Sequence, residues 1–162
     1  MHIDYLAAYP GLIPELTELL FAEWQDLYLA AGLSQADLAA ALQERAVRDS
    51  LPLTLVAVDQ DGQLVAAGSI KLSEDGTRVG LSPWLGGIYV KAQYRGLGLG
   101  AQIVTSLEQK AREQGVSRLY LSADSAVNFY QKLGWQVLDR VDSLDVRNVA
   151  LMWKDLTSEP LQ

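Results

Sequence analysis

Residues 85–100 read LGGIYVKAQYRGLGLG, and we expect the fold to be organised around this stretch. Its apolar start is typical of a buried strand, and three closely spaced glycines then lead into a helix. The first amides of a helix have no acceptor within the helix, and the helix dipole adds positive potential there. With Arg95 at its mouth, the stretch predicts a site for a phosphate or a pyrophosphate-bearing cofactor. On the loop alone, a tight turn that only packs the helix stays open as an alternative.

The composition predicts one soluble domain covering residues 1–162. Hydrophobic residues make up 49% of the chain, yet no apolar run approaches the length of a membrane span and no signal-peptide pattern opens it. A cytoplasmic location without membrane partners is therefore expected. Cysteine is absent and His2 is the single histidine, which argues against disulfides, a cysteine nucleophile and a metal site.

Charge is distributed unevenly along the sequence. Residues 1–90 carry 12 acidic and 4 basic side chains, whereas residues 91–118 carry 2 acidic and 5 basic ones. A net charge of -7 argues against nucleic acid as a partner. An acidic body beside a basic loop suits an anionic cofactor and a cationic substrate such as an amine.

The remaining patterns predict alternating strands and helices. Ser34 and Asp37 form a capping box before a helix, and Asp61-Gly62 is typical of a hairpin turn. The switch from strand to helix and back near residue 100 predicts a right-handed crossover between parallel strands. We expect a frayed tail at 156–162, strands at 2–9, 53–58, 64–71, 84–90, 118–122, 135–140 and 146–154, and helices at 14–29, 34–46, 101–114 and 126–133.

Two segments, IYVKAQYRGLGLG at 88–100 and AVNFYQKLGW at 126–135, resemble the GCN5-related N-acetyltransferase (GNAT) superfamily. The first motif is matched by Arg95, Gly98 and Gly100, and the second by Ala126, Phe129, Tyr130, Gly134 and Trp135. The resemblance implies an α/β (α+β) GNAT fold with a central mixed seven-stranded sheet that splays between its fourth and fifth strands. Its element order is strand, two helices, three strands, helix, strand, helix and two strands.

The resemblance also implies acetyl-CoA as the acetyl donor. The backbone of Ile88, Tyr89 and Val90 would bind the pantetheine arm, with Gly86-Gly87 compatible with a bulge that splays the strand. Many family members have asparagine where this chain has Ala123, so either Asp124 or Asn128 substitutes or that contact is lost. The residues expected to bind the pyrophosphate are Arg95, Gly96, Leu97, Gly98, Leu99, Gly100 and Ala101, with Asn128 as a further ligand of the pantetheine or phosphate end.

Tyr130 corresponds to the family's general acid, which protonates the departing CoA thiolate. The implied reaction is acetyl transfer to a primary amine of an unidentified, cationic small molecule or protein. A general base is not identifiable, although Glu23, Glu74 and Asp75 are carboxylate candidates. The residues expected to border the acceptor are Glu23, Trp24, Trp84 and Leu85, and a homodimer is left open.

Two alternatives compete with an active acetyltransferase. The chain could be a catalytically silent CoA-binding or sensing module of the same fold. It could also be a dinucleotide-binding oxidoreductase, because Gly96, Gly98 and Ala101 satisfy a permissive G-x-G-x-x-[GA] pattern. That fingerprint should follow its strand directly, whereas six residues intervene here, and it leaves residues 126–135 unexplained.

Overall fold

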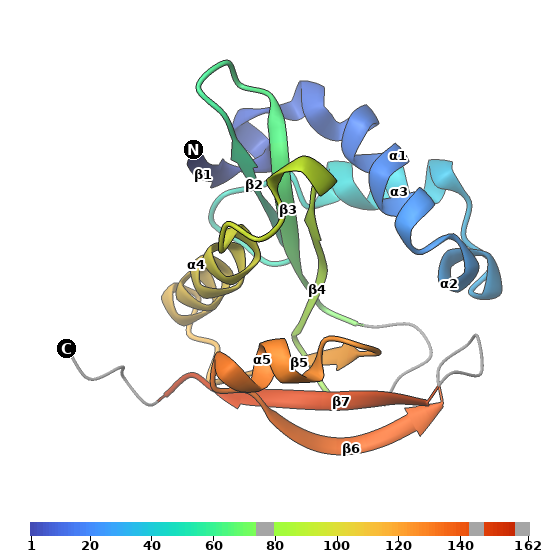
Figure 1. Cartoon of the computed structure of the whole chain (residues 1–162), viewed down its shortest axis with the longest axis vertical. Helices are drawn as coiled ribbons and strands as arrows, with labels where there is room; N and C mark the ends of the chain where they lie inside the picture. The colour runs from blue at the N-terminus through green and yellow to red at the C-terminus, as the bar shows by residue number, and fades with distance from the viewer. Residues whose placement is uncertain (74–79, 143–147, 158–162) are drawn as a thin grey trace.

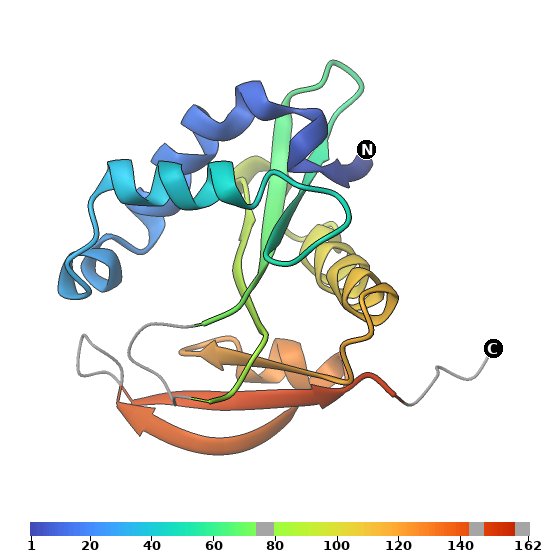
Figure 2. The ribbon, with the colours of Figure 1, turned by 180° about the vertical axis from the view of Figure 1, so that it is seen from behind.

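A computed structural model describes residues 1–73, 80–142 and 148–157, shown from two sides in Figures 1 and 2. Three short 3₁₀ turns occur at residues 6–8, 10–12 and 92–94. The other elements are β1 (His2–Tyr5), α1 (Ile13–Glu23), α2 (Gln25–Ala30), α3 (Gln35–Glu44), β2 (Leu53–Val58), β3 (Leu64–Lys71), β4 (Trp84–Val90), α4 (Leu99–Glu113), β5 (Arg118–Ala123), α5 (Val127–Lys132), β6 (Gln136–Asp142) and β7 (Asn148–Asp155).

The seven strands form one mixed sheet in the order β1-β2-β3-β4-β5-β7-β6. All neighbours are antiparallel except β4 and β5, which the crossover through α4 makes parallel. These two strands pair only at Trp84 and Tyr120. Beyond that pair they diverge, and the halves of the sheet separate as Figure 1 shows. The predicted mixed, splayed seven-stranded sheet is thereby confirmed.

A β-bulge in β4 accompanies this divergence. Ala67 pairs with Tyr89 and Ser69 pairs with Gly86, so two residues of β4 lie opposite the single residue Gly68. One of the two is Gly87, whose positive φ of 63° is costly for any side-chain-bearing residue. The bulge predicted at the two glycines is therefore present.

Helices cover both faces of the sheet (Figures 1 and 2). On one face α4 and α5 enclose the larger core, and on the other α1 and α3 pack over β2 and β3. The approach of α4 to β3 requires Gly68, because a Cβ there would lie 2.6 Å from Ile103 Cγ2. Among the described residues no helix is long and apolar enough to cross a bilayer.

Most predicted elements are observed, with differences at the ends. Strand β1 stops at Tyr5 instead of residue 9, because two 3₁₀ turns precede α1. The predicted helix 14–29 is interrupted at Trp24, whose φ of -121° and ψ of 36° are not helical. The capping box of Ser34 and Asp37 is confirmed, and its hydrogen bonds lower the pKa of the Asp37 carboxyl. Leu156, predicted to fray, is buried, and its N–H donates to the Ser117 carbonyl oxygen.

Candidate functional site

A cavity of about 460 Å³ lies where β4 parts from β5, and we call it the cleft cavity. It occupies the carboxyl ends of the parallel strands, where α/β folds place their ligands. Its lining comes from β4, the glycine loop, the start of α4, helix α5 and the end of α1. The lining residues are Glu23, Ile88, Tyr89, Val90, Tyr94, Arg95, Gly96, Gly98, Leu99, Gly100, Ala101, Ala126, Phe129 and Tyr130.

The structure thus brings together nine of the eleven predicted cofactor-binding residues. The two that do not line the cleft cavity are Leu97 and Asn128, whose side chains are exposed. Asp124, the other candidate for replacing the family's asparagine, is exposed beyond the end of β5 and does not line it either. Ala123 itself is buried in the core.

The start of α4 has the geometry of an anion site. Gly98 is its N-cap, and Gly96 and Gly98 both have positive φ, near 80°. The first intrahelical bond runs from the Gln102 N–H to the Gly98 carbonyl, so the amides of residues 99–101 precede the helical hydrogen-bond ladder. The first turn holds no acidic side chain. Three amides and the positive end of a 15-residue helix dipole therefore face the cavity.

The edge of β4 offers backbone groups to the same cavity. Lys91 N–H donates to the Val65 carbonyl, so the adjoining pair, Ala66 and Val90, is one that does not exchange hydrogen bonds. The N–H and C=O of Val90 consequently point away from β3. Arg95 Nε donates to that carbonyl over 2.9 Å, and its guanidinium carbon lies 5.8 Å from the centre of the Tyr89 ring. Arg95, which we expected to bind the pyrophosphate, therefore donates to the backbone carbonyl of Val90, a residue that we expected to bind the pantetheine arm.

Tyr130 is held in α5 between two aromatic rings. The Phe129 ring meets it edge-on at 5.0 Å between centroids, and the Trp135 ring does so at 6.1 Å. The side chain is 9% exposed and lines the cleft cavity. Burial raises the pKa of Tyr130 to about 12. The phenol is therefore protonated at neutral pH and can donate a proton into the cavity.

The four residues expected near the acceptor have different positions. Glu23 is exposed at the end of α1 and lines the cleft cavity together with Tyr130. Trp24 is half-buried against the core beneath α1 and α3, and it does not line that cavity. Trp84 and Leu85 are each 1% exposed, and neither of them lines it. Glu74 and Asp75, the other carboxylates considered for the base, lie outside the described residues.

Trp84 has a structural position at the point where the sheet divides. The centroids of the Trp84 and Tyr120 rings lie 5.7 Å apart, and these two residues are the single pair that joins β4 to β5. Its Nε1–H donates to the Leu81 carbonyl over 2.7 Å. Leu85 belongs to the core under α4. The contact with Tyr120 buries Trp84 where the strands begin to diverge, and Leu85 packs in the core, so neither side chain lines the cleft cavity.

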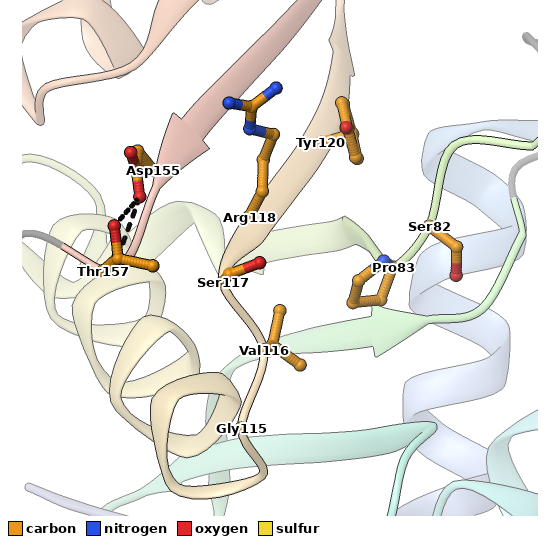
Figure 3. A pocket seen from close by; sticks show the side chains of 9 residues that line it. All are labelled: Ser82, Pro83, Gly115, Val116, Ser117, Arg118, Tyr120, Asp155 and Thr157. Atoms are coloured by element: carbon orange, nitrogen blue, oxygen red, sulfur yellow. Dashed lines mark hydrogen bonds between the residues drawn. The ribbon is translucent and has the colours of Figure 1, made fainter.

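Two further cavities flank the divided sheet. One of about 250 Å³, the helix-side cavity, lies between α1–α3 and the sheet and includes Leu20, Tyr28, Ser69 and Gly87 in its lining. Its lining residue Gly87 is followed on β4 by Ile88, which lines the cleft cavity. The other, about 560 Å³, is open and lies at the opposite, amino ends of β4 and β5 (Figure 3). Its remote position separates it from Tyr130.

Sequence reasoning missed several residues of this region. Tyr94, at the end of a 3₁₀ turn, lines the cleft cavity, but an aromatic residue in a loop carried no signal for this. Phe129 was noted only as part of a motif, although its ring lies 3.5 Å from where a Cβ on Gly100 would be. Ser122 of β5 has a buried hydroxyl oxygen without a hydrogen-bond partner, the only such side-chain atom in the described chain. A buried polar group of this kind depends on three-dimensional packing and is invisible in a sequence.

Known proteins resemble this chain in sequence and in fold. A glucosamine 6-phosphate N-acetyltransferase from Trypanosoma brucei brucei is 30% identical over 87 residues, which span 52% of this chain and 59% of that protein. An aminoglycoside 6′-N-acetyltransferase complexed with coenzyme A matches the fold with a TM-score of 0.76, at 18% identity over 99% of each chain. A ribosomal-protein-alanine N-acetyltransferase from Brucella melitensis matches with a TM-score of 0.72, at 20% identity over 96% of this chain and 99% of that one.

A sequence profile described as the Acetyltransferase (GNAT) family matches residues 13–135. That range includes both motifs on which the sequence resemblance rested, the glycine loop and the segment containing Tyr130. It also covers α1 and the divergence of β4 from β5, and therefore the whole lining of the cleft cavity. The chain accordingly belongs to the GNAT acetyltransferase family, whose enzymes use acetyl-CoA.

Proposed function

We propose that this protein is an acetyl-CoA-dependent N-acetyltransferase acting on a primary amine. The observation that carries the proposal is that two features meet in one cavity. The first is the anion site formed by the amides of residues 99–101 at the start of α4, which we call the phosphate cradle, and the second is a buried, protonated tyrosine. Amides at the start of α4 would bind the pyrophosphate, and the N–H of Val90, which points away from β3, would bind the pantetheine arm. Acetyl-CoA supplies a thioester whose acetyl group passes to the amine nitrogen, with release of the CoA thiol.

Tyr130 is proposed as the general acid. Its hydroxyl would give its proton to the leaving sulfur as the carbon–sulfur bond breaks, so that the thiol departs neutral. A pKa of about 12 keeps the proton on the phenol before that moment, and the rings of Phe129 and Trp135 fix its direction. The resulting phenolate would regain a proton from solvent.

Glu23 is proposed as the general base. An alkylammonium must lose a proton before its nitrogen can attack, and a carboxylate within the cavity can accept it directly or through water. Among the carboxylates considered from the sequence, Glu23 is the one that the described structure places in the lining of the cleft cavity. Glu23 ends α1 and Tyr130 lies in α5, so the base and the acid would approach from different helices.

The acceptor is proposed to enter through the helix-side cavity, whose lining includes the bulge residue Gly87. That cavity combines apolar residues such as Leu20 with Tyr28 and the charged side chains Asp37, Arg45 and Lys71. Such a lining suits an amine that carries further polar groups. Amino sugars are the acceptor class we favour, because the similar proteins include a glucosamine 6-phosphate and an aminoglycoside N-acetyltransferase.

A thiol-release assay with acetyl-CoA and a panel of amines tests the proposal. The panel should hold glucosamine 6-phosphate, an aminoglycoside, a polyamine, free amino acids and peptides. We expect Tyr130→Phe to lower kcat about 100-fold or more while coenzyme A affinity changes less than about twofold. We expect Glu23→Gln to lower the rate mainly on the acid side of the pH profile.

The possible failures are distinct. Full turnover by Tyr130→Phe would remove Tyr130 from the acid role. Coenzyme A binding by the wild type without turnover of any amine would favour the catalytically silent module. Binding of NAD(H) in place of coenzyme A in a calorimeter would favour the dinucleotide-binding alternative.

A further inference from the structure

A buried carboxylate on α4 connects three elements around Tyr130 without lining the cleft cavity. Glu108 is 2% exposed. Its Oε1 accepts a hydrogen bond from Lys154 Nζ of β7 over 2.7 Å, and its Oε2 accepts one from Trp135 Nε1–H over 3.1 Å. Lys154 Nζ also donates to the Leu133 carbonyl, again over 2.7 Å. A buried charge is retained only where it is paired and hydrogen-bonded, so this carboxylate is fully committed to its two donors.

The two donors hold the end of α5, the helix that carries Tyr130. The helix closes with the bonds of a Schellman motif, from the Trp135 N–H to the Tyr130 carbonyl and from the Gly134 N–H to the Gln131 carbonyl. Gly134 has the positive φ, 94°, that this motif requires. The Leu133 carbonyl, left without an intrahelical partner, is the one that Lys154 caps. Tyr130 therefore lies one turn before a helix end that is fixed by Lys154 and Trp135.

The same carboxylate also orients the ring against which Tyr130 packs. The Trp135 indole is 2% exposed, and the Nε1–H bond to Glu108 sets its rotation. Its ring then meets the Tyr130 ring edge-on at 6.1 Å. Glu108 belongs to α4, whose first turn forms the phosphate cradle. Glu108 therefore connects α4 to the Trp135 ring, and the Trp135 ring in turn packs against the ring of Tyr130.

We propose that Glu108 is a positioning residue for acetyl transfer: acting with Lys154 through Trp135, it sets the Tyr130 hydroxyl relative to the cofactor cradle on its own helix. This inference rests on the proposed function of Tyr130. Nothing in it requires Glu108 to contact the cofactor or the acceptor. Because misplacement of a reacting group by about 1 Å can cost about 100-fold in rate, the link affects catalysis more than binding.

The first test compares Glu108→Gln with Glu113→Gln, a matched change on the same helix. Glu113 is exposed and, within the described residues, pairs with Lys110 alone at 3.5 Å, so its loss should change neither rate nor structure. For Glu108→Gln we expect kcat to fall about 10-fold to 100-fold with the KM for acetyl-CoA within about twofold. Hydrogen exchange followed by mass spectrometry should become faster in residues 127–132 and stay unchanged in β2 and β3. Unchanged exchange in 127–132 would overturn the proposal whether or not the enzyme turns over.

A double-mutant cycle separates positioning from a general loss of stability. If Glu108 acts through Tyr130, then Glu108→Gln should cause less than about a twofold further loss of kcat in a Tyr130→Phe background. A loss that is as large in that background as in the wild type would overturn the inference while leaving the acid role intact. Full activity of Tyr130→Phe alone would instead refute the proposed function and, with it, this role of Glu108.

Variants of Lys154 provide a second route if Glu108→Gln folds poorly. Lys154→Met removes the cap on the Leu133 carbonyl and the charge that Glu108 faces, and it should reproduce the selective fall in kcat. Lys154→Arg keeps a cationic donor and should recover most of the rate, to within about threefold of the wild type. Equal rates for the methionine and arginine variants would contradict the proposal.

Discussion

The two ends of α4 offer a matched pair of glycines for testing the phosphate cradle. Gly98 at the start and Gly115 just past the end both have a φ of 79°. A Cβ at either position would meet no atom within 4 Å. The two sites therefore differ little in strain or crowding, but Gly98 lines the cleft cavity and Gly115 does not.

The perturbation is alanine at one position or the other. A left-handed backbone conformation costs a non-glycine residue about 1–2 kcal/mol, so each variant should lose that much free energy of unfolding. The two losses should agree to within about 0.5 kcal/mol, as measured by urea denaturation. Only Gly98→Ala adds a methyl group where we place the pyrophosphate and disturbs the amides of the first turn. We expect its coenzyme A affinity to fall at least tenfold, which corresponds to about 1.4 kcal/mol.

The assay is calorimetric titration of each variant with coenzyme A, at a temperature where both are fully folded. Gly115→Ala should bind with an affinity within about twofold of the wild type, which excludes a general effect of destabilisation. If Gly98→Ala binds as well as Gly115→Ala, then the pyrophosphate does not occupy the cradle and the reasoning from the glycine loop fails.

Two further predictions concern protonation and packing. Burial raises the folded-state pKa of Tyr130 from 10.0 to about 12, so the contribution of this group to stability is complete below pH 10 and is lost as the pH rises from 10 towards 12. We therefore expect no fall in kcat with a midpoint near pH 10. Such a midpoint in a pH–rate profile would contradict the role of Tyr130 as the general acid. Gly68→Ala should cost about 1–3 kcal/mol in urea denaturation, because its Cβ would lie 2.6 Å from Ile103 Cγ2 and 2.7 Å from Ile88 Cδ1. Gly11→Ala, where a Cβ meets nothing within 4 Å, is its control and should change stability by less than about 0.5 kcal/mol.

Local patterns made much of this fold predictable. Strands β2, β3 and β4 have the predicted bounds, because short apolar runs between turn residues specify them without tertiary information. The break at Trp24 was not predictable, because the apolar spacing continues across it and the periodicity alone favours one helix. Leu156 was assigned to a frayed tail by its position near the end, whereas a backbone bond to Ser117 and a bond from Arg112 Nε hold it in the core. Both errors arose where tertiary contacts override a local preference.

The cofactor side of the site could be anticipated far better than the acceptor side. Glycines with positive φ and a helix start are encoded within a few consecutive residues, so the sequence indicated residues 95–101 as a ligand site, and all of them except Leu97 line the cleft cavity. Which residues could border the acceptor depends on the bulge in β4 and on where β4 and β5 stop pairing, because these decide which side chains leave the core. Trp84 was expected there because it begins β4, but the single pairing with Tyr120 buries it at the junction. The bulge at Gly87 also shifts the alternation, so that Leu85 and Ile88, three residues apart, face the same core.

The divergence of β4 from β5 gives the two motifs a common site although about thirty residues separate them. Parallel strands end at the same edge of a sheet, so the loop after β4 and the helix after β5 must both begin there. The single residue pair at Trp84 and Tyr120 then lets that edge open into a cavity, where continued pairing would have closed it. Glu108 lies on α4, the crossover that makes the strands parallel, and its carboxylate accepts hydrogen bonds from Trp135 and Lys154. A change that extended the β4–β5 pairing would therefore close the cavity between the glycine loop and Tyr130, even with every lining residue kept.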